Sequence, residues 1–392
     1  MPFVVIISAT RTPLGAFQGS YLSVPVARLG ATVIKGVLES ARLDSGEITD
    51  VVLGNVLQAG QGQAPARQAS ILAGLSQSVR AVTINKVCGS GLQALMQASH
   101  ALRSNMGSFY IAGGMENMSQ APYLLPKARE GYRMGHQQVV DSMVLDGLWD
   151  PYNNLHMGAC AEQCATKFAI SREQQDSFAV ESFRRAIAAQ ADGRLAEEIT
   201  PFEIAGLKGQ ANRIEHDEGP GRVRYDKIPA LRPSFKEGGS ITAANASSLS
   251  DGAAALLVST EEAARAQGLV PLARIVSFGA HANDPLWFTT APVHAARQAL
   301  KLAGWSVADV DLWEVNEAFA VVPLAFMREM DVSHECLNVR GGAIALGHPL
   351  GASGARIVIT LIAALRERGL RRGLAAICIG GGEGLAVCIE LL

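Results

Sequence analysis

An internal repeat constrains the fold of this 392-residue chain more than any other feature of its sequence. Two pairs of segments recur in the same order, namely 50–59 with 309–318 and 89–116 with 352–383. The first pair shares a strand that follows an apolar helical pattern. The second shares a helix start of small residues, a helix and a glycine-rich strand end. Self-similarity of this kind is the signature of a supersecondary unit used more than once, so the order of the matches predicts two copies of one α/β unit.

Apolar runs alternate with amphipathic stretches through both ends of the chain, which is typical of an α/β protein. Buried strands are predicted at residues 3–9, 51–56, 109–112, 253–259, 374–379 and 385–391. Helices are predicted at residues 26–42, 89–103, 171–191, 291–302, 317–330 and 353–368. The fold class expected is therefore α/β.

A segment of different character, residues 119–249, separates the two copies and contains several glycine- and proline-rich loop signals. We interpret it as an insertion into the first unit, which comprises residues 1–118 and 250–270. The second unit comprises residues 271–392. An insertion at this place is expected to cover the site as a lid or a substrate-binding region.

Composition restricts the partners of the protein. Charged residues make up 18% of the chain and the net charge is −2, so no basic field favours a nucleic acid or an anionic membrane. The expected partner is a small molecule. Six cysteines are too few for a disulfide scaffold of this length, which favours a reduced, cytoplasmic setting. The first residues have no basic segment before their short apolar run, so neither a signal peptide nor a membrane span is expected.

Cys88 lies where an apolar run meets a predicted helix, in the sequence Val87-Cys88-Gly89-Ser90-Gly91. A thiolate is a strong nucleophile, and the N–H groups and dipole of a helix N-terminus favour it. The neighbouring glycines let a substrate carbonyl approach backbone N–H groups closely. Cys88 is therefore a candidate nucleophile, and a buried structural cysteine is the alternative.

His348 and Cys378 lie in similar settings of the second unit. His348 is placed on a constrained loop by Gly347 and Pro349, at the position that the repeat makes equivalent to Cys88. A solvated loop histidine is the alternative. Cys378 ends an apolar strand and precedes Gly380-Gly381-Gly382, and strands tolerate such glycines where a ligand or another backbone approaches. The alternative for Cys378 is a buried strand residue before a hairpin turn.

Asn316 lies where a predicted strand passes into a helix. Asparagine is a favoured helix N-cap, and the position also suits an amide that points into the site and holds a water. His156, Cys160 and Cys164 follow one another at spacings of four, but zinc would need a fourth ligand and usually closer pairs, so we expect helix packing there and no metal site. There is neither GxxxxGK[ST] nor a GxGxxG after the first strand, which disfavours a nucleotide-cofactor fold.

Together these motifs resemble the thiolase family, and most of all its members of the acetoacetyl-CoA type. The likeness runs over essentially the whole chain. It is carried by residues 11–15 (RTPLG), 85–91 (NKVCGSG), 113–119 (GGMENMS), 156–158 (HMG), 243–247 (AANAS), 316–319 (NEAF), 347–351 (GHPLG) and 378–382 (CIGGG). The resemblance implies a duplicated five-layer α/β/α/β/α fold with a loop domain inserted into the N-terminal half, and a homotetramer.

The resemblance also implies roles for the residues that match the family's motifs. Cys88 would be acylated by the first acyl-CoA, His348 would activate it, and Cys378 would remove the α-proton of the second acetyl-CoA. Asn316, acting through a water, and His348 would form one oxyanion hole, and the N–H groups of Cys88 and Gly380 a second. A Claisen condensation needs a covalent acyl carrier, a group that generates a carbanion equivalent, and fixed donors for both oxyanions, which agrees with these roles.

Most CoA contacts are expected from the inserted segment. By motif they are Leu148, His156, Met157, Phe235, Ala243, Ser247, Ala318 and Phe319. The chain departs from the family pattern at residues 218–222, where relatives place a basic residue or a tyrosine. Arg222 is the expected substitute, and without the tyrosine a potassium requirement is not expected. Phe288 replaces a methionine of many biosynthetic relatives and also occurs in relatives that accept a 2-methyl branch, so the substrate range stays open.

The expected function is reversible condensation of two acetyl-CoA to acetoacetyl-CoA and free CoA, in ping-pong order through an acyl-cysteine. CoA thioesters are then the substrates and no cofactor is needed. A degradative 3-ketoacyl-CoA thiolase of broader chain length is the first alternative. Two other classes share the fold: a decarboxylative ketoacyl synthase, which generally pairs its cysteine with two histidines or with His and Asn, and an inactive acyl-CoA-binding protein.

Overall fold

One mixed β-sheet forms the frame of the protein, whose computed structural model describes residues 2–205 and 211–392. It consists of two parts, called here the first and the second sheet, which one strand pair joins. The first sheet has the order β4-β3-β5-β12-β1, and a short strand β2 (Gly15–Ala16) pairs with β12. Its strands are β1 (Val4–Arg11), β3 (Asp50–Gly54), β4 (Arg80–Ile84), β5 (Phe109–Asn117) and β12 (Ser250–Thr260). The second sheet has the order β14-β15-β16-β13. Its strands are β13 (Ala273–Ala282), β14 (Leu312–Val315), β15 (Arg372–Ile379) and β16 (Glu383–Leu391).

The strand pairing of the first half recurs in the second. In the first, β3 runs parallel to β4 and β5, and β12 runs antiparallel to β5 and β1. In the second, β14 runs parallel to β15 and makes a parallel bridge to Leu337, and β16 runs antiparallel to β15 and β13. Segments 50–59 and 309–318 thus begin equivalent strands, β3 and β14. The predicted duplication is confirmed, and β1 joins the halves by pairing with β13.

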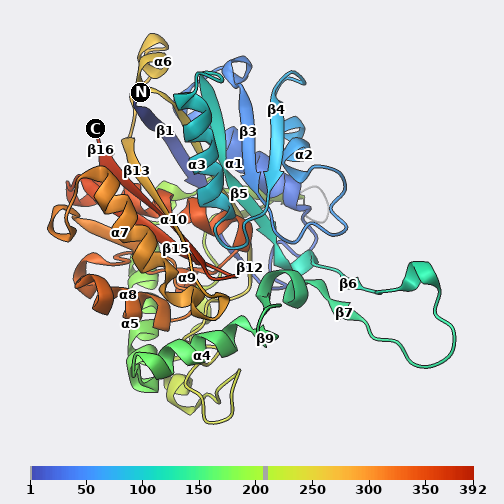
Figure 1. Ribbon diagram of the computed structural model, residues 1–392. Coiled ribbons are helices and arrows are strands. Elements are labelled where there is room, and N and C mark those ends of the chain that lie inside the picture. Colours follow the sequence, from blue (N-terminus) through green and yellow to red (C-terminus); the bar gives the residue numbers. More distant parts are fainter. Residues whose placement is uncertain (1, 206–210) are drawn as a thin grey trace.

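Helices cover both faces of each sheet, which gives five layers (Figure 1). Helices α1 (Val26–Ala41) and α2 (Pro65–Leu72) pack on the outer face of the first sheet. Helices α7 (Ala291–Ala303) and α8 (Val321–Met330) pack on the outer side of the second. The middle layer consists of α3 (Ser90–Arg103) and α10 (Leu350–Arg368), which contact each other and both sheets. The five-layer α/β/α/β/α fold expected from the resemblance is therefore confirmed.

The amino-acid pattern of α10 follows from its place in the middle layer. Its side chains from Leu350 to Ile362 are buried all round, including the run Ile357, Val358 and Ile359. A helix that is apolar on every side needs packing partners on every side. The two sheets supply them, since one buried cluster combines α10, α3 and strands of both halves.

The inserted segment consists of short elements that wrap around the rest of the fold. Its helices are α4 (Met157–Lys167) and α5 (Arg172–Ala191), and its short strand pairs are β6 (Tyr123–Leu124) with β7 (Val140–Asp141), β8 (Trp149–Asp150) with β9 (Leu155–His156), and β10 (Phe202–Ala205) with β11 (Ala211–Ile214). The β6–β7 hairpin forms an arm that projects from the body (Figure 1). The remaining helices are α6 (Glu261–Ala266) and α9 (Ala343–Leu346).

A buried ion-pair cluster anchors the insertion to both halves. Arg11 of β1 pairs with Glu198 and Asp217 of the insertion at 3.1 and 2.7 Å. Arg340 of the C-terminal half reaches the same Glu198 at 2.9 Å. Removing one partner of such a pair leaves an uncompensated buried charge, so the cluster fixes the position of the insertion. In the described part of the chain, no helix combines the length and the apolar character needed to cross a membrane.

One predicted helix begins later than expected. The helix predicted at 317–330 is α8, which begins at Val321. The preceding residues form a loop because they pair with the insertion: Ser247 N donates to Ala318 O at 3.0 Å and Ala320 N donates to Asn245 O at 2.9 Å. These tertiary contacts override the helical preference of the sequence.

Candidate active site

A strained turn holds Cys88 at the start of α3. Val87 has a positive φ of 46°, which is costly for a β-branched residue. Hydrogen bonds on both sides fix this conformation: Val87 N donates to Asn85 Oδ1 at 2.9 Å, and Ser90 Oγ donates to Val87 O at 2.7 Å. Residues that keep such strain cluster at functional sites. The turn leaves Cys88 partly exposed, next to the first residues of a helix.

The starts of α3 and α10 touch through glycines, which brings Cys88 toward His348. A Cβ on Gly91 of α3 would lie 2.7 Å from Ala355 N, and one on Gly354 of α10 would lie 2.4 Å from Leu92 N. No side chain fits at either place, so the two backbones meet directly. Cys88 precedes α3 and His348 precedes α10. The contact between the two repeated units at these turns therefore has a packing cause.

His348 lies on the loop between α9 and α10, and its ring is held by Ser353. Ser353 Oγ donates to Pro349 O at 2.9 Å, so it accepts from His348 Nδ1–H, 2.6 Å away. The proton is thereby placed on Nδ1. Nε2 is buried and has no hydrogen-bond partner among the described residues. Its lone pair is free to accept a proton.

The imidazole of His348 is neutral. Burial and the positive charge of Arg356 lower the pKa of His348 to about 3. Arg356 is itself buried and paired with Glu314 at 2.8 Å, so its charge is fixed behind the site. A neutral histidine with a free Nε2 can act as a general base near neutral pH.

Cys378 ends β15 and faces Cys88 from the other half. It is fully buried and lies opposite Gly384 in the antiparallel β15–β16 hairpin, as the packing alternative for this residue expected. The functional prediction is compatible with that place, because the N–H of the nearby Gly380 donates to the Cys88 sulfur. An ion pair between Lys86 and Glu383 ties the turn before Cys88 to the strand after the glycine run.

Burial outweighs the helix N-terminus at Cys88. Burial raises the pKa of Cys88 to about 12, and the N–H groups of Gly380 and Cys88, which favour the thiolate, offset this only in part. Burial, and the proximity of Cys88, also raise the pKa of Cys378 well above its usual range. Both thiols are therefore protonated at rest, and each needs a proton acceptor during the reaction.

Asn316 follows β14 but does not cap the next helix. The N-cap of α8 is Ala320, so the N-cap interpretation of Asn316 is wrong. Asn316 is buried, and its Oδ1 accepts from Arg356 at 3.5 Å. Its Nδ2 has no partner within the described residues. Buried amide donors are rarely left unpaired, so this group is available to a bound molecule.

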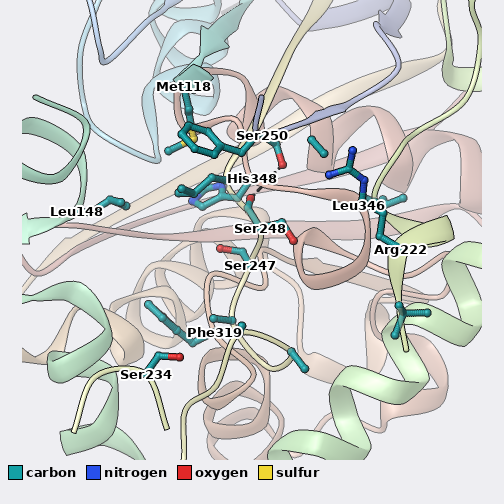
Figure 2. A pocket seen from close by; sticks show the side chains of 18 of the residues that line it. Met118, Leu148, Arg222, Ser234, Ser247, Ser248, Ser250, Phe319, Leu346 and His348 are labelled. Atoms are coloured by element: carbon teal, nitrogen blue, oxygen red, sulfur yellow. Dashed lines mark hydrogen bonds between the residues drawn. The ribbon is translucent and has the colours of Figure 1, made fainter. Parts of the chain in front are cut away.

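A cavity of about 720 Å³ leads to His348. Figure 2 shows His348 between Met118 and Ser247, with Leu148 and Arg222 toward opposite sides of the cavity. Cys88 packs on the cluster of Met118, Met143 and Leu350 that forms part of the wall. The cavity size suits a substrate of the size of a cofactor or drug molecule.

The predicted CoA contacts divide into two groups. Seven line the cavity: Leu148, His156, Arg222, Phe235, Ala243, Ser247 and Phe319. Met157, Phe288 and Ala318 do not line it. The first two are buried in the cluster that also contains Cys378, and Ala318 holds Ser247 by a backbone hydrogen bond. Phe288 reaches the cavity wall indirectly, through edge-on packing against Phe319 at a centroid distance of 6.3 Å.

Several cavity residues were not predicted. The apolar ones include Phe17, Met143 and Leu350, which come from segments far apart in the sequence; Leu350 lies in the motif 347–351, but no contact was assigned to it. Two further cations, Arg224 and Lys227, line the cavity beside Arg222. The short spacing of these three basic residues is a signal that the sequence does contain. Arg222 lies 3.6 Å from Glu218 and Arg224 lies 3.7 Å from Asp226, so two of these charges are partly compensated within the protein. All three side chains can donate to an anionic group on the bound molecule.

The arrangement can transfer an acyl group between thiols. A neutral base and a thiol precede two helices that touch at their starts, the Gly380 N–H and the unpaired Asn316 amide supply donors, and Cys378 lies close enough to Cys88 for Cys88 to raise its pKa. Such a site holds an acyl group covalently and offers donors where negative charge develops on oxygen.

Comparison with known proteins agrees over the whole chain. Residues 4–262 match the family described as "Thiolase, N-terminal domain", and residues 269–391 match "Thiolase, C-terminal domain". The chain is 50% identical over 390 residues to a Pseudomonas aeruginosa protein named "Acetyl-CoA acetyltransferase", with 99% of each chain covered. It is 48% identical over 391 residues to a Cupriavidus necator protein of the same name, with 100% of each covered.

A solved structure supports the same assignment. The crystal structure of the Bacillus anthracis acetyl-CoA acetyltransferase has a TM-score of 0.97 to this fold at 38% sequence identity, and covers 100% of this chain and 99% of that one. Sequence, fold and site geometry agree from end to end. The chain therefore belongs to the thiolase family and is an acyltransferase.

Proposed function

We propose that this thiolase condenses two acetyl-CoA into acetoacetyl-CoA and free CoA, reversibly and in ping-pong order. The observation that carries the proposal is the neutral His348, which lines the cavity, has a free Nε2 and is held at Nδ1 by Ser353. The curated relatives named acetyl-CoA acetyltransferase support the choice of substrate.

The first half-reaction acylates Cys88. His348 Nε2 takes the thiol proton as the sulfur attacks the carbonyl carbon of acetyl-CoA, because a thiol with a pKa of about 12 needs a base. The N–H groups of Cys88 and Gly380 stabilise the oxyanion. As the C–S bond of acetyl-CoA breaks, Cys378 gives its proton to the departing CoA sulfur. The products are acetyl-Cys88, free CoA, protonated His348 and the Cys378 thiolate.

The second half-reaction forms the carbon–carbon bond. The Cys378 thiolate removes an α-proton from the second acetyl-CoA, and burial makes it a strong base because its pKa is well above the usual range. Protonated His348 and the Asn316 amide face the enolate oxygen. The enolate carbon attacks the acetyl carbon, the Cys88–acyl bond breaks, and Cys88 regains its proton from His348. Each lost oxyanion donor should cost about 3 kcal/mol of transition-state stabilisation.

CoA is proposed to enter with its nucleotide at the basic rim. Arg222, Arg224 and Lys227 offer three cations for phosphate groups, and the apolar wall suits the pantetheine chain. Ser247 offers a hydroxyl beside His348 (Figure 2). This orientation directs the thioester toward Cys88.

Thiolysis rates on 3-ketoacyl-CoA substrates of four to ten or more carbons test the short-chain assignment. The buried Phe288–Phe319 contact supports it, because Phe319 lines the cavity and Phe288 fills the space behind that wall. The four-carbon substrate should be preferred. A preference for eight or more carbons would instead assign the protein as a degradative thiolase. Parallel lines in initial-rate plots against both substrates are the expected sign of ping-pong order.

The two other classes give different products. A decarboxylative synthase would incorporate malonyl-thioester carbon and release CO₂, and such a result would overturn the assignment. An inactive binding protein would bind CoA without any CoA-dependent loss of acetoacetyl-CoA. Val87 keeps a strained positive φ, which a protein without catalytic activity would not need. This strain and the free Nε2 of His348 argue for the active enzyme.

A homotetramer is the proposed assembly. The arm between β6 and β7 exposes apolar side chains, among them Leu125 at 55%, Met134 at 97% and Val139 at 58% exposure. Strand β4 is an edge strand that exposes Val82. Both features are liabilities unless another chain covers them. Light scattering should give four times the mass of the chain, and deletion of the arm should reduce it.

A reduced, cytoplasmic setting is proposed together with a role in lipid metabolism. All six cysteines are free, and the chemistry needs two of them as thiols. Cell fractionation tests the location.

A further inference from the structure

The carboxylate of Glu116 joins the two halves of the active site. Glu116 is the last residue but one of β5 and is fully buried. Its Oε1 accepts from Asn55 Nδ2 at 2.9 Å and from Leu57 N at 3.1 Å. Its Oε2 accepts from Val56 N at 3.0 Å and from Gly351 N at 2.9 Å. The first three donors belong to the N-terminal half, and the fourth belongs to α10 of the C-terminal half.

The bond to Gly351 determines where His348 lies. Gly351 is the second residue of α10, three positions after His348, and its N–H is one of the donors that a helix leaves unpaired at its start. The contact is close on every side, because a Cβ on Gly351 would lie 2.8 Å from Met115 O and 2.9 Å from Asn55 Cα. A carboxylate at a helix N-terminus is also electrostatically favoured.

The other three bonds determine the wall on which Cys88 packs. Val56 and Leu57 belong to the apolar cluster that Cys88 contacts, together with Leu350. One side chain therefore sets both the loop under the nucleophile and the helix that carries the base. Burial raises the pKa of Glu116 to about 7, although all four partners are N–H donors that favour the carboxylate. No amide can replace the carboxylate without placing donor against donor.

We propose that Glu116 is a positioning residue for acyl transfer, which fixes His348 relative to Cys88 and keeps a negative charge behind the nucleophile. This inference rests on the proposed function, because it needs His348 to act on Cys88. Burial is the main cause of the raised pKa of Cys88, and Glu116 is the charged side chain that adds to it, whereas Lys86, two residues before Cys88, is paired with Glu383. His348 and Cys378, the other titratable groups of the site, are uncharged at rest.

Two variants separate the position of the carboxylate from its charge. Glu116→Asp keeps the charge but withdraws it by one methylene from Gly351 N. Its kcat for thiolysis should fall about 100-fold with KM little changed, since misplacing a catalytic group by about 1 Å has such an effect. The rate at which iodoacetamide alkylates Cys88, read by peptide mass at fixed pH, should stay near that of wild type.

Glu116→Gln removes the charge as well. Its kcat should fall at least as far as that of Glu116→Asp. Alkylation of Cys88 should become about tenfold faster at a pH below the pKa of Cys88, because loss of a nearby negative charge favours the thiolate. The alkylation is measured without substrate, so it tests the inference even if the enzyme prefers another acyl-CoA. Glu198→Gln is the matched control: it also removes a buried carboxylate, but one bound by Arg11, Arg340 and Thr360, and should leave the alkylation rate unchanged.

Three results would overturn the proposal. One is a kcat per folded site within about threefold of wild type in both variants. A second is an alkylation rate that does not respond to Glu116→Gln. The third is failure of both variants to fold under conditions where Glu198→Gln folds, because that would assign Glu116 to the fold alone. Inactivity of wild-type protein on every 3-ketoacyl-CoA would instead contradict the proposed function.

Discussion

His348 Nδ1 lies 2.6 Å from the hydroxyl of Ser353, and that hydroxyl donates to Pro349 O. The direction of the second bond determines the first, so Ser353 accepts from the imidazole and the proton lies on Nδ1. The free Nε2 then faces the site as a base. The state of the base thus depends on a residue that does not contact the substrate.

Ser353→Ala should impair catalysis more than stability. Without its acceptor the ring can change tautomer or turn, and kcat for thiolysis should fall about 10- to 100-fold, part of the contribution of a general base. Ser99→Ala is the control, because Ser99 is also buried and donates to a carbonyl four residues earlier, Leu95 O, at 2.8 Å. Each variant should lose roughly 1 kcal/mol of stability. Equal kcat values in both would contradict the role given to Ser353.

Cys88→Ser and Cys378→Ser should separate the half-reactions. Cys88→Ser should form no acyl-enzyme, because a hydroxyl beside His348 is a far poorer nucleophile than a thiol. Cys378→Ser should still transfer an acetyl group to Cys88 but should not deprotonate the second acetyl-CoA, since a serine hydroxyl is too weakly acidic to provide the base. The protein mass after incubation with labelled acetyl-CoA reports the adduct.

Cys388→Ala provides the control for this experiment, because Cys388 is a buried cysteine of β16 outside the site. It should acquire the adduct like wild type. An acetyl adduct on Cys88→Ser, or none on a folded Cys378→Ser, would show that the two roles are assigned wrongly.

The sequence predicts a site residue when the neighbouring residues in the chain already indicate its backbone conformation, and not when its role depends on distant partners. Cys88, His348 and Cys378 each lie beside glycines that mark a turn or a close approach, and the structure places all three at such points. The duplicated sheet could be inferred because equivalent strands keep the same neighbours. The sequence does not indicate the roles of Ser353 and Glu116, because these roles depend on hydrogen-bond partners that only the folded chain brings near.

Two features of the site have physical causes that the sequence does not contain. A helix N-terminus favours the Cys88 thiolate, but burial dominates the pKa of Cys88. The helix predicted from residue 317 begins only at Val321, and Glu317 in the preceding loop accepts hydrogen bonds from Ser182 Oγ and Ile344 N. Local preference is overridden where distant segments supply the hydrogen bonds.

Phe288→Leu should widen the acyl range. Phe288 is 2% exposed and packs edge-on against Phe319 of the cavity wall, so a smaller side chain opens space behind that wall. The ratio of thiolysis rates for 3-ketohexanoyl-CoA over acetoacetyl-CoA should rise about tenfold, which is within the range for one or two methylenes. Phe326→Leu removes a similarly buried ring, packed on Trp313, and should leave the ratio unchanged. An unaltered ratio in Phe288→Leu would place the chain-length limit elsewhere.

Acid should destabilise the wild-type protein more than a His348→Asn variant. Burial and Arg356 lower the pKa of His348 to about 3, from an ordinary value of 6.5. Between these values the unfolded chain binds a proton that the folded chain does not. This contribution to stability is complete above pH 6.5 and is lost as the pH falls toward 3. The slope approaches about 1.4 kcal/mol per pH unit, so wild type should lose about 2 kcal/mol relative to the variant between pH 7 and pH 5.

Denaturant unfolding of both proteins at the two pH values, at one protein concentration, measures the difference. If it is the same at both, His348 is protonated as easily in the folded protein as in the unfolded chain, and it cannot be the neutral base on which acylation of Cys88 depends.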